Sequence, residues 1–157
     1  MVKRPIRREL VVPVDTARLA EVRRAASETA LAAGFDEAEA RLIALAVDDA
    51  VTNVIRHSYR AAEHPEAQWV EVTLSADDER LEVLVRDTGA AIDLGRVPQF
   101  VDINEHVRRG RRGGLGIFLM RRIMDEVNYL FRRGEQNELR MVKYIDRSRR
   151  TAKNDSA

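Results

Sequence analysis

The first part of the chain carries its apolar residues at helical spacing. Between residues 16 and 33 they recur every three to four positions, at Leu19, Val22, Ala26 and Ala30. This period predicts a helix that ends near Ala33. Asp15 or Thr16 can cap its first turn, and Gly34 can end it in a left-handed conformation.

A second helix is predicted immediately afterwards. Asp36 and Glu39 have the spacing of a capping box, in which each side chain accepts a hydrogen bond from the other residue's backbone amide. The helix is expected to reach about Tyr59. Its buried stripe is expected to contain Ile43, Val47, Ala50 and Val54.

Alternating apolar and polar residues then predict strands. Residues 69–75 and 80–86 each alternate in this way, with a turn at Asp77 between them, so they form a hairpin. An earlier run at 6–12 also reads as a strand. Pro13 closes it, because proline has no amide hydrogen to donate to a ladder.

The last third of the chain combines an irregular stretch with regular elements. Residues 88–112 are polar with few apolar anchors, and connections of this length in compact domains are usually functional or mobile. Helical periodicity returns at 115–126, and strands are expected near 127–133 and 138–145. The polar segment 147–157 is expected to be a disordered tail.

Helices followed by pairs of strands, rather than a strict strand-helix alternation, predict a two-layer α+β domain. The chain has 157 residues, the length of one domain, which we place at 1–146.

Composition narrows the classes of function. The 27 basic and 26 acidic residues nearly cancel, which argues against non-specific binding of nucleic acid. No cysteine is present, so disulfides and thiolate chemistry are excluded. The histidines have no metal-ligand spacing and stand at His57, His64 and His106. No apolar run reads as a secretory signal or a membrane span, so we expect a soluble intracellular protein.

Three polar segments carry candidate chemistry, and the first lies on the second predicted helix. Asp49, Asn53 and His57 are four residues apart, so they line one flank beside the buried stripe. A carboxylate and a carboxamide at a core edge suit a divalent metal with phosphate oxygens, or a proton-accepting site. Ordinary polar residues bordering an amphipathic helix are the alternative.

The second segment ends a predicted strand. Asp87 can accept a hydrogen bond from an adenine amino group, and Gly89 lets the chain pass close to the base. The alternative is an aspartate that starts an ordinary turn.

The third segment opens a helix with glycines at Gly113, Gly114 and Gly116. Unhindered backbone amides at the positive end of a helix dipole form a phosphate-binding arrangement. A flexible hinge before the helix is the alternative. The segment is not a P-loop, because no Gly-Lys-Ser/Thr follows.

In order and spacing, the three segments resemble the N, G1 and G2 boxes of the GHKL (Bergerat-fold, histidine-kinase-like) ATPases. Two stretches, AVTNVIRHSY at 50–59 and GGLGIFLMRRIMDEVNY at 113–129, are similar to the anti-sigma-factor serine/threonine-protein kinase branch. The resemblance runs from the first strand to about Ile145. It implies a Bergerat-type two-layer α/β sandwich, with a mixed, mainly antiparallel sheet and helices on one face.

The resemblance implies roles on the helix of the first segment. Asn53 takes the position of the asparagine that coordinates Mg²⁺ at the ATP phosphates, and Asp49 that of the general base. The family usually has glutamate at the latter place. Aspartate is one methylene shorter, and a displacement of about 1 Å can cost roughly a hundredfold in rate. Asp48 is expected on a different face of the helix.

The resemblance also implies the remaining nucleotide contacts. Asp87 matches the adenine-reading aspartate, with Gly89 beside it. The matching phosphate-contacting positions are Gly113, Gly114, Leu115 and Gly116. The residues between the last two boxes form an ATP lid in the family. Four arginines there either offset phosphate charge or form a solvated basic loop, namely Arg108, Arg109, Arg111 and Arg112.

The implied function is an ATP-dependent anti-sigma factor. It phosphorylates a serine or threonine on a STAS-domain anti-sigma-factor antagonist and sequesters a sigma factor, as a cytoplasmic homodimer without direct contact to nucleic acid or membrane. The alternative, motivated by Asp49, is a nucleotide-binding partner-switching regulator with weak or no kinase activity. A third interpretation is an α+β protein whose boxes are coincidental.

Overall fold

The computed structural model describes the elements of the fold and leaves several connections undescribed. It covers residues 4–13, 18–61, 69–87, 119–130 and 137–146, with side chains except at 56–61, 129–130 and 137. The elements are β1 (Ile6–Pro13), α1 (Leu19–Ala33), α2 (Glu37–Ala61), β2 (Trp69–Ala76), β3 (Arg80–Asp87), β4 (Glu126–Leu130) and β5 (Asn137–Tyr144). Residues 119–123 are also helical. The expected tail at 147–157 lies outside the described residues.

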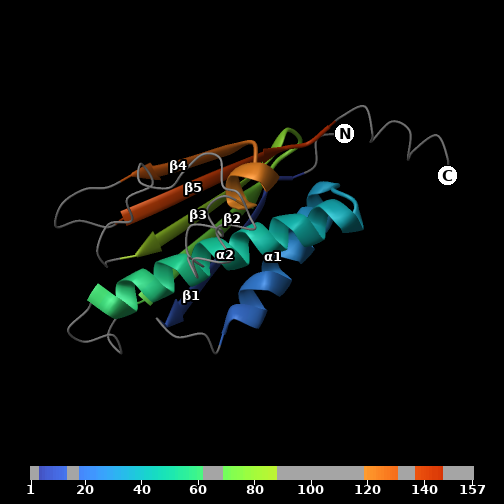
Figure 1. The fold of residues 1–157 in the computed structure, drawn as a ribbon. Coiled ribbons are helices and arrows are strands. Elements are labelled where there is room, and N and C mark those ends of the chain that lie inside the picture. Colours follow the sequence, from blue (N-terminus) through green and yellow to red (C-terminus); the bar gives the residue numbers. More distant parts are fainter. Residues whose placement is uncertain (1–3, 14–17, 62–68, 88–118, 131–136, 147–157) are drawn as a thin grey trace, which may run out of the picture.

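The strands form one sheet in the order β1-β2-β3-β5-β4. Every pairing between described strands is antiparallel. α1 and α2 pack against each other and lie on one face of the sheet (Figure 1). The predicted two-layer α+β sandwich with helices on one face is therefore confirmed.

Local signals define the junction between the two helices. Gly34 follows α1 with φ 110°, the left-handed conformation that glycine adopts without steric cost. Asp36 and Glu39 form the predicted capping box at the start of α2. The Glu39 amide donates to Asp36 Oδ1 at 2.8 Å, and the Asp36 amide donates to Glu39 Oε2 at 3.1 Å. Two of the helix's unsatisfied amides are thus paired.

The start of α1 differs from the prediction. The helix begins at Leu19 with Arg18 at the N-cap, and no side chain caps it. Instead, the Arg18 backbone carbonyl accepts from the Glu21 and Val22 amides, and the Arg18 guanidinium pairs with Glu21. Asp15 and Thr16, the expected caps, lie outside the described residues.

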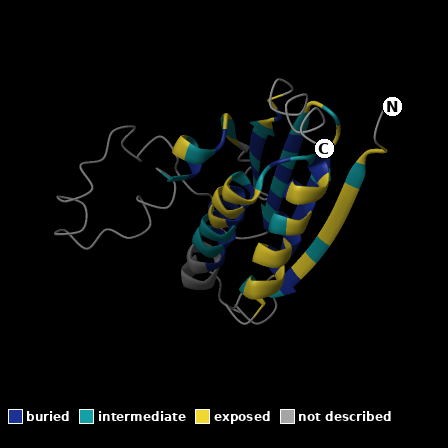
Figure 2. Ribbon diagram, turned by 90° about the vertical axis from the view of Figure 1, so that its right-hand side faces the viewer, coloured by how far each residue is buried: buried dark blue, intermediate teal, exposed yellow. Residues whose placement is uncertain are grey.

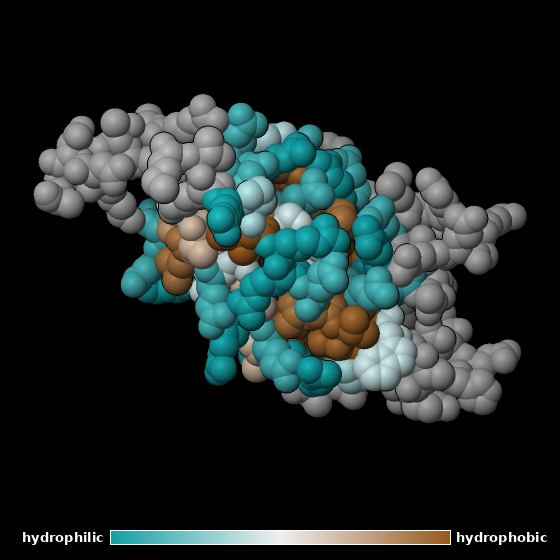
Figure 3. Space-filling model, turned by 180° about the vertical axis from the view of Figure 1, so that it is seen from behind, coloured by the Kyte–Doolittle hydropathy of each residue, from teal (hydrophilic) through white to brown (hydrophobic). Residues whose placement is uncertain are grey.

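The core lies between the helices and the inner face of the sheet (Figure 2). The predicted stripe of α2 is buried, and so are the inward side chains of β2 and β3. These core residues are Ile43, Val47, Ala50, Val54, Val70, Val72, Leu74, Leu81, Val83 and Val85. Because successive strand residues point to opposite faces, their neighbours form an outer face on which polar side chains predominate (Figure 3).

The helix expected at 115–126 ends earlier. Its last described helical hydrogen bond joins the Met124 amide to the Met120 carbonyl at 2.9 Å. The next amide, that of Asp125, donates to the Val142 carbonyl of β5 at 2.8 Å. Pairing with β5 therefore replaces helix continuation, and β4 begins at Glu126.

In the described part of the chain, no helix combines the length and the apolar character needed to cross a membrane.

Candidate nucleotide-binding site

α2 positions the first two candidate residues at the edge of the core. Asp49 and Asn53 are partly exposed, whereas Ala50 and Val54, one position further along, are almost fully buried. One turn of helix separates Asp49 from Asn53, so they share a flank. Asp49 Oδ2 and Asn53 Nδ2 are themselves buried from solvent. The helix thus holds a carboxylate and a carboxamide together where the core meets solvent.

The Asn53 side chain fits a ligand site. Its buried Nδ2 atom has no hydrogen-bond partner among the residues that the structure describes. A buried amide without a partner costs about 1–3 kcal/mol, so native proteins rarely keep one without a reason. Turning the amide over exchanges its nitrogen and oxygen. In either orientation an unused donor or acceptor is available, and the oxygen is an atom that suits Mg²⁺.

Asp48 is oriented differently from Asp49. Its Oδ1 atom lies 3.3 Å from Nη1 of Arg23 on α1, so it faces the neighbouring helix. This confirms the prediction that Asp48 lies on a different face of α2. Of these two carboxylates, the one on the flank of Asn53 is therefore that of Asp49.

Asp87 ends β3 on the inner face of the sheet. It is only 4% exposed and pairs in register with Val70 on β2 and with Asn137 on β5. The preceding Arg86 points to the outer face and binds Glu138 through Nε at 2.9 Å. The strand alternation therefore places the Asp87 carboxylate on the inner face and the neighbouring Arg86 guanidinium on the outer face.

The structure places these residues on one side of the sheet. α2 packs against β3, and its C-terminal half runs toward the end of β3 that carries Asp87 (Figure 1).

The other predicted site residues lie outside the described residues: Gly89, Gly113, Gly114, Leu115 and Gly116. The same holds for the four lid arginines. The backbone of His57 is within α2, but its side chain is not described.

The helix that follows the glycine segment is anchored in the core. Met120 and Met124 are 0% and 3% exposed. Lys143 of β5 donates from Nζ to the Ile123 carbonyl at 2.9 Å. The sequence analysis did not identify Lys143. The available signal was a lysine continuing the alternation of Leu139 and Met141 at an inward position.

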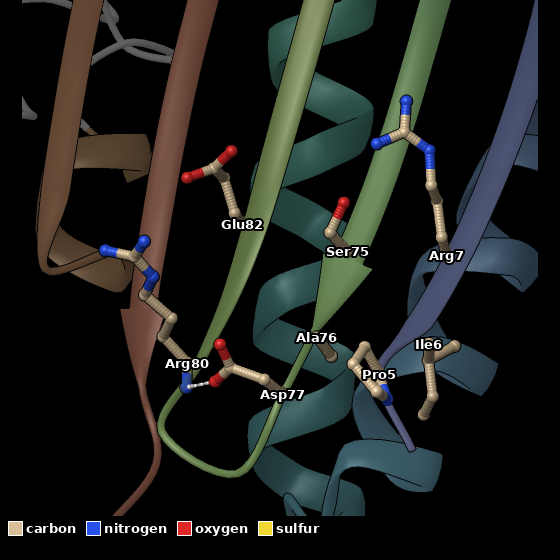
Figure 4. A pocket seen from close by; sticks show the side chains of 8 residues that line it. All are labelled: Pro5, Ile6, Arg7, Ser75, Ala76, Asp77, Arg80 and Glu82. Atoms are coloured by element: carbon tan, nitrogen blue, oxygen red, sulfur yellow. Dashed lines mark hydrogen bonds between the residues drawn. The ribbon is translucent and has the colours of Figure 1, made fainter.

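A surface pocket of about 270 Å³ lies elsewhere, at the turn between β2 and β3 (Figure 4). Three of the charged side chains that line it are already engaged. Arg7 binds Glu9, Glu82 binds Arg140, and Asp77 accepts from backbone amides. β3 starts here and reaches Asp87 about 23 Å away at 3.3 Å per residue. The pocket is therefore not part of the candidate nucleotide site.

Comparison with known proteins identifies the family. The histidine kinase-like ATPase domain matches residues 12–143. The serine-protein kinase RsbW of Listeria monocytogenes is 32% identical over 117 residues, which cover 73% of this chain and 71% of the relative. RsbW of Bacillus cereus is 26% identical over 142 residues, covering 88% and 85%, and RsbW of Staphylococcus epidermidis is 31% identical over 116, covering 72% and 69%. The resemblance drawn from the three boxes is thus confirmed, and the chain belongs to the histidine kinase-like ATPase domain family.

Proposed function

We propose that this protein is an ATP-dependent serine/threonine-protein kinase of the partner-switching kind. It phosphorylates a STAS-domain anti-sigma-factor antagonist and sequesters a sigma factor. The relatives named serine-protein kinase support the activity. The observation that carries the proposal is the buried Asn53 amide, unpartnered among the described residues, beside Asp49 on α2.

Each residue of the proposed site has a separate task. Asn53 would hold Mg²⁺, which neutralises phosphate charge when it is bound with ATP. Asp87, buried at the end of β3, would accept the adenine amino hydrogen. Asp49 would accept the proton of the substrate hydroxyl. The glycines of the third segment would donate their amides to phosphate oxygens.

Asp49 motivates the second candidate function, a nucleotide-gated switch with weak or no kinase activity. Its Oδ2 atom is buried, and the helix fixes the carboxylate close to the backbone. If the short side chain of Asp49 limits the reaction, Asp49→Glu will raise the rate of phosphotransfer strongly. No change will mean that aspartate is competent or that another feature limits transfer.

The kinase proposal is tested with Mg-ATP labelled at the γ-phosphate and a purified STAS-domain protein as acceptor. We expect label on a serine or threonine of the acceptor, and none with Asn53→Ala. ATP-dependent complex formation without transfer of label would favour the switch. If the protein neither transfers label nor forms a complex, both functions are contradicted.

We also propose a cytoplasmic homodimer, because a sigma factor acts in the cytoplasm and the outer face of the sheet suits a second copy. Val11, Trp69 and Tyr144 are each about half exposed, at 49%, 50% and 48%. The same face carries paired charges of both signs, including Arg140 with Glu82 at 2.8 Å. Such a surface can complement itself about a two-fold axis.

A further inference from the structure

An exposed apolar strip, made of Ala38, Leu42 and Leu45, follows α2 on the N-terminal side of Asp49. All three residues are exposed, the two leucines by 51% and 42%. Successive members are three or four residues apart, and Leu45 stands four residues before Asp49, so the strip and Asp49 share one ridge of the helix. At about 1.5 Å per residue, Leu45 lies roughly 6 Å from Asp49 along the helix axis and Leu42 roughly 10–11 Å. The strip therefore leads directly to the proposed proton acceptor.

The core does not use the two leucines. The buried side of α2 is formed by other residues, among them Ile43, Val47 and Ala50, each of which is 0% exposed. Single apolar residues scattered over a surface are normal, whereas neighbouring ones that form a patch mark contacts with other molecules. Leu42 and Leu45 are neighbours within one turn of α2. They are therefore suited to contact an apolar surface of a partner.

The charges that border the strip toward α1 are already paired. Arg41 Nη2 lies 3.5 Å from Oε2 of Glu37, and Asp48 Oδ1 lies 3.3 Å from Nη1 of Arg23. Each pair joins one cation to one anion, so this border carries no excess charge of either sign. The strip thus suits a partner surface that is apolar and nearly neutral rather than a strongly charged one.

The size of the strip favours a partner that binds briefly. A stable interface buries about 800 Å² on each partner, far more than two half-exposed leucines present. A small apolar contact can still contribute much of the affinity of a weak complex. The protein that accepts the phosphoryl group must bring its hydroxyl to Asp49 and then leave, so it has both the required position and the required lifetime.

We infer that the strip of Ala38, Leu42 and Leu45 is a docking surface for the acceptor protein, which contacts it with apolar side chains that lie beside the serine or threonine to be phosphorylated. The inference rests on the proposed function, because it places the acceptor hydroxyl at Asp49. The strip contributes affinity for the acceptor and does not contact the nucleotide.

The double variant Leu42→Gln/Leu45→Gln tests the inference. Glutamine is close to leucine in size and in helix propensity, so the exposed face of α2 is kept while its apolar character is lost. Initial rates of phosphotransfer are measured with saturating Mg-ATP and increasing concentrations of a purified STAS-domain acceptor. The KM for the acceptor should rise about tenfold or more, because apolar burial in the complex is lost. The kcat should stay the same, since this contact is equal in the ground state and the transition state.

Val11→Thr is the matched control. Val11 is 49% exposed, but it lies on β1 and points to the outer face of the sheet, away from the helices (Figure 1). Threonine has nearly the same shape and replaces a methyl group by a hydroxyl. The variant should leave the KM for the acceptor unchanged. If the double variant of α2 does not fold, each single glutamine variant replaces it, with an expected rise of about threefold.

The outcomes separate the inference from the function on which it rests. A higher KM for the acceptor, with unchanged kcat, ATP affinity and melting temperature, would support the inference. An unchanged KM would overturn it, and so would an equal rise in KM with Val11→Thr. A change of molar mass in light scattering would assign the strip to a second copy instead and would also overturn it. If the wild-type protein transfers no phosphate, the proposed function fails, and the inference fails with it.

Discussion

At the scale of single residues, the buried side-chain amide of Asn53 is the feature that the proposed ligand site explains best. Its Nδ2 atom is buried and unpartnered among the described residues. A buried amide that lacks a partner costs free energy that a well-packed apolar group in its place would not cost. The proposed role in ligand binding would give this amide a partner.

Asn53→Ala should separate function from stability. We expect phosphotransfer to fall at least about a hundredfold, since the proposed metal ligand is lost. The melting temperature without nucleotide should stay the same or rise, because the substitution removes an unsatisfied buried group. Thermal unfolding followed by circular dichroism checks this. A substantial loss of stability would show that Asn53 has a structural partner.

At the scale of elements, short-range signals in the sequence proved sufficient where the partners are close in the chain. The capping box of Asp36 and Glu39 was predicted because both members lie within one helical turn, and Gly34 because its position needs a left-handed residue. The prediction for the start of α1 was wrong, because the Arg18 carbonyl and guanidinium take the place of a side-chain cap. A helix start of this kind cannot be predicted from the positions of serine, threonine or aspartate in the sequence.

Gly34→Ala should destabilise the junction of α1 and α2. With φ at 110°, alanine brings its Cβ against the backbone, and the expected cost is about 1–2 kcal/mol. Urea unfolding of the two proteins measures the change. Gly34→Asn is the control and should lose less, because asparagine tolerates left-handed conformations better. Equal stability of wild type and Gly34→Ala would contradict the assigned conformation.

The turn between β2 and β3 should make the free energy of unfolding depend on pH in the acidic range. The Glu79 and Arg80 backbone amides donate to Asp77 Oδ1 and hold the pKa of Asp77 below its ordinary value of 3.8. A lowered folded-state pKa means that the contribution is complete above the unfolded pKa and is lost as pH falls through the folded one.

Asp77→Asn removes that titration while keeping an acceptor for the two amides. The difference in free energy of unfolding between wild type and variant should therefore shrink as pH falls below about 4. Denaturant titrations at a series of pH values test this. A difference that stays constant down to strongly acidic pH would mean that the carboxylate charge does not strengthen the turn.

At the scale of the whole molecule, contacts between distant parts of the chain limited what the sequence could predict. Strand alternation identified the hairpin of β2 and β3, but not that β5 lies between β3 and β4. The contact of Lys143 with Ile123 is equally non-local, since it depends on that strand order. For the site, helical periodicity predicted the common flank of Asp49 and Asn53, and strand periodicity predicted the position of Asp87. Gly89 and the glycines from Gly113 to Gly116 remain predictions.

The proposed homodimer should depend on the outer face of the sheet. Trp69→Glu places a charge on that face, where the wild-type side chain is 50% exposed, and should shift the molar mass in light scattering from dimer to monomer. Leu45→Glu makes the same change on α2, at a side chain 42% exposed, and should leave the mass unchanged. A wild-type monomer, or a Trp69→Glu dimer of unaltered affinity, would contradict this arrangement.

The central claim is that α2 and the end of β3 contribute to one ATP site, and calorimetric titration of Mg-ATP tests it most directly. The account predicts saturable binding of one nucleotide per chain, no comparable binding of Mg-GTP, and a loss of about tenfold or more in ATP affinity with Asp87→Asn. That variant keeps the size of a side chain that is 4% exposed. Absence of ATP binding by the folded wild-type protein, or equal affinity for ATP and GTP, would contradict the account.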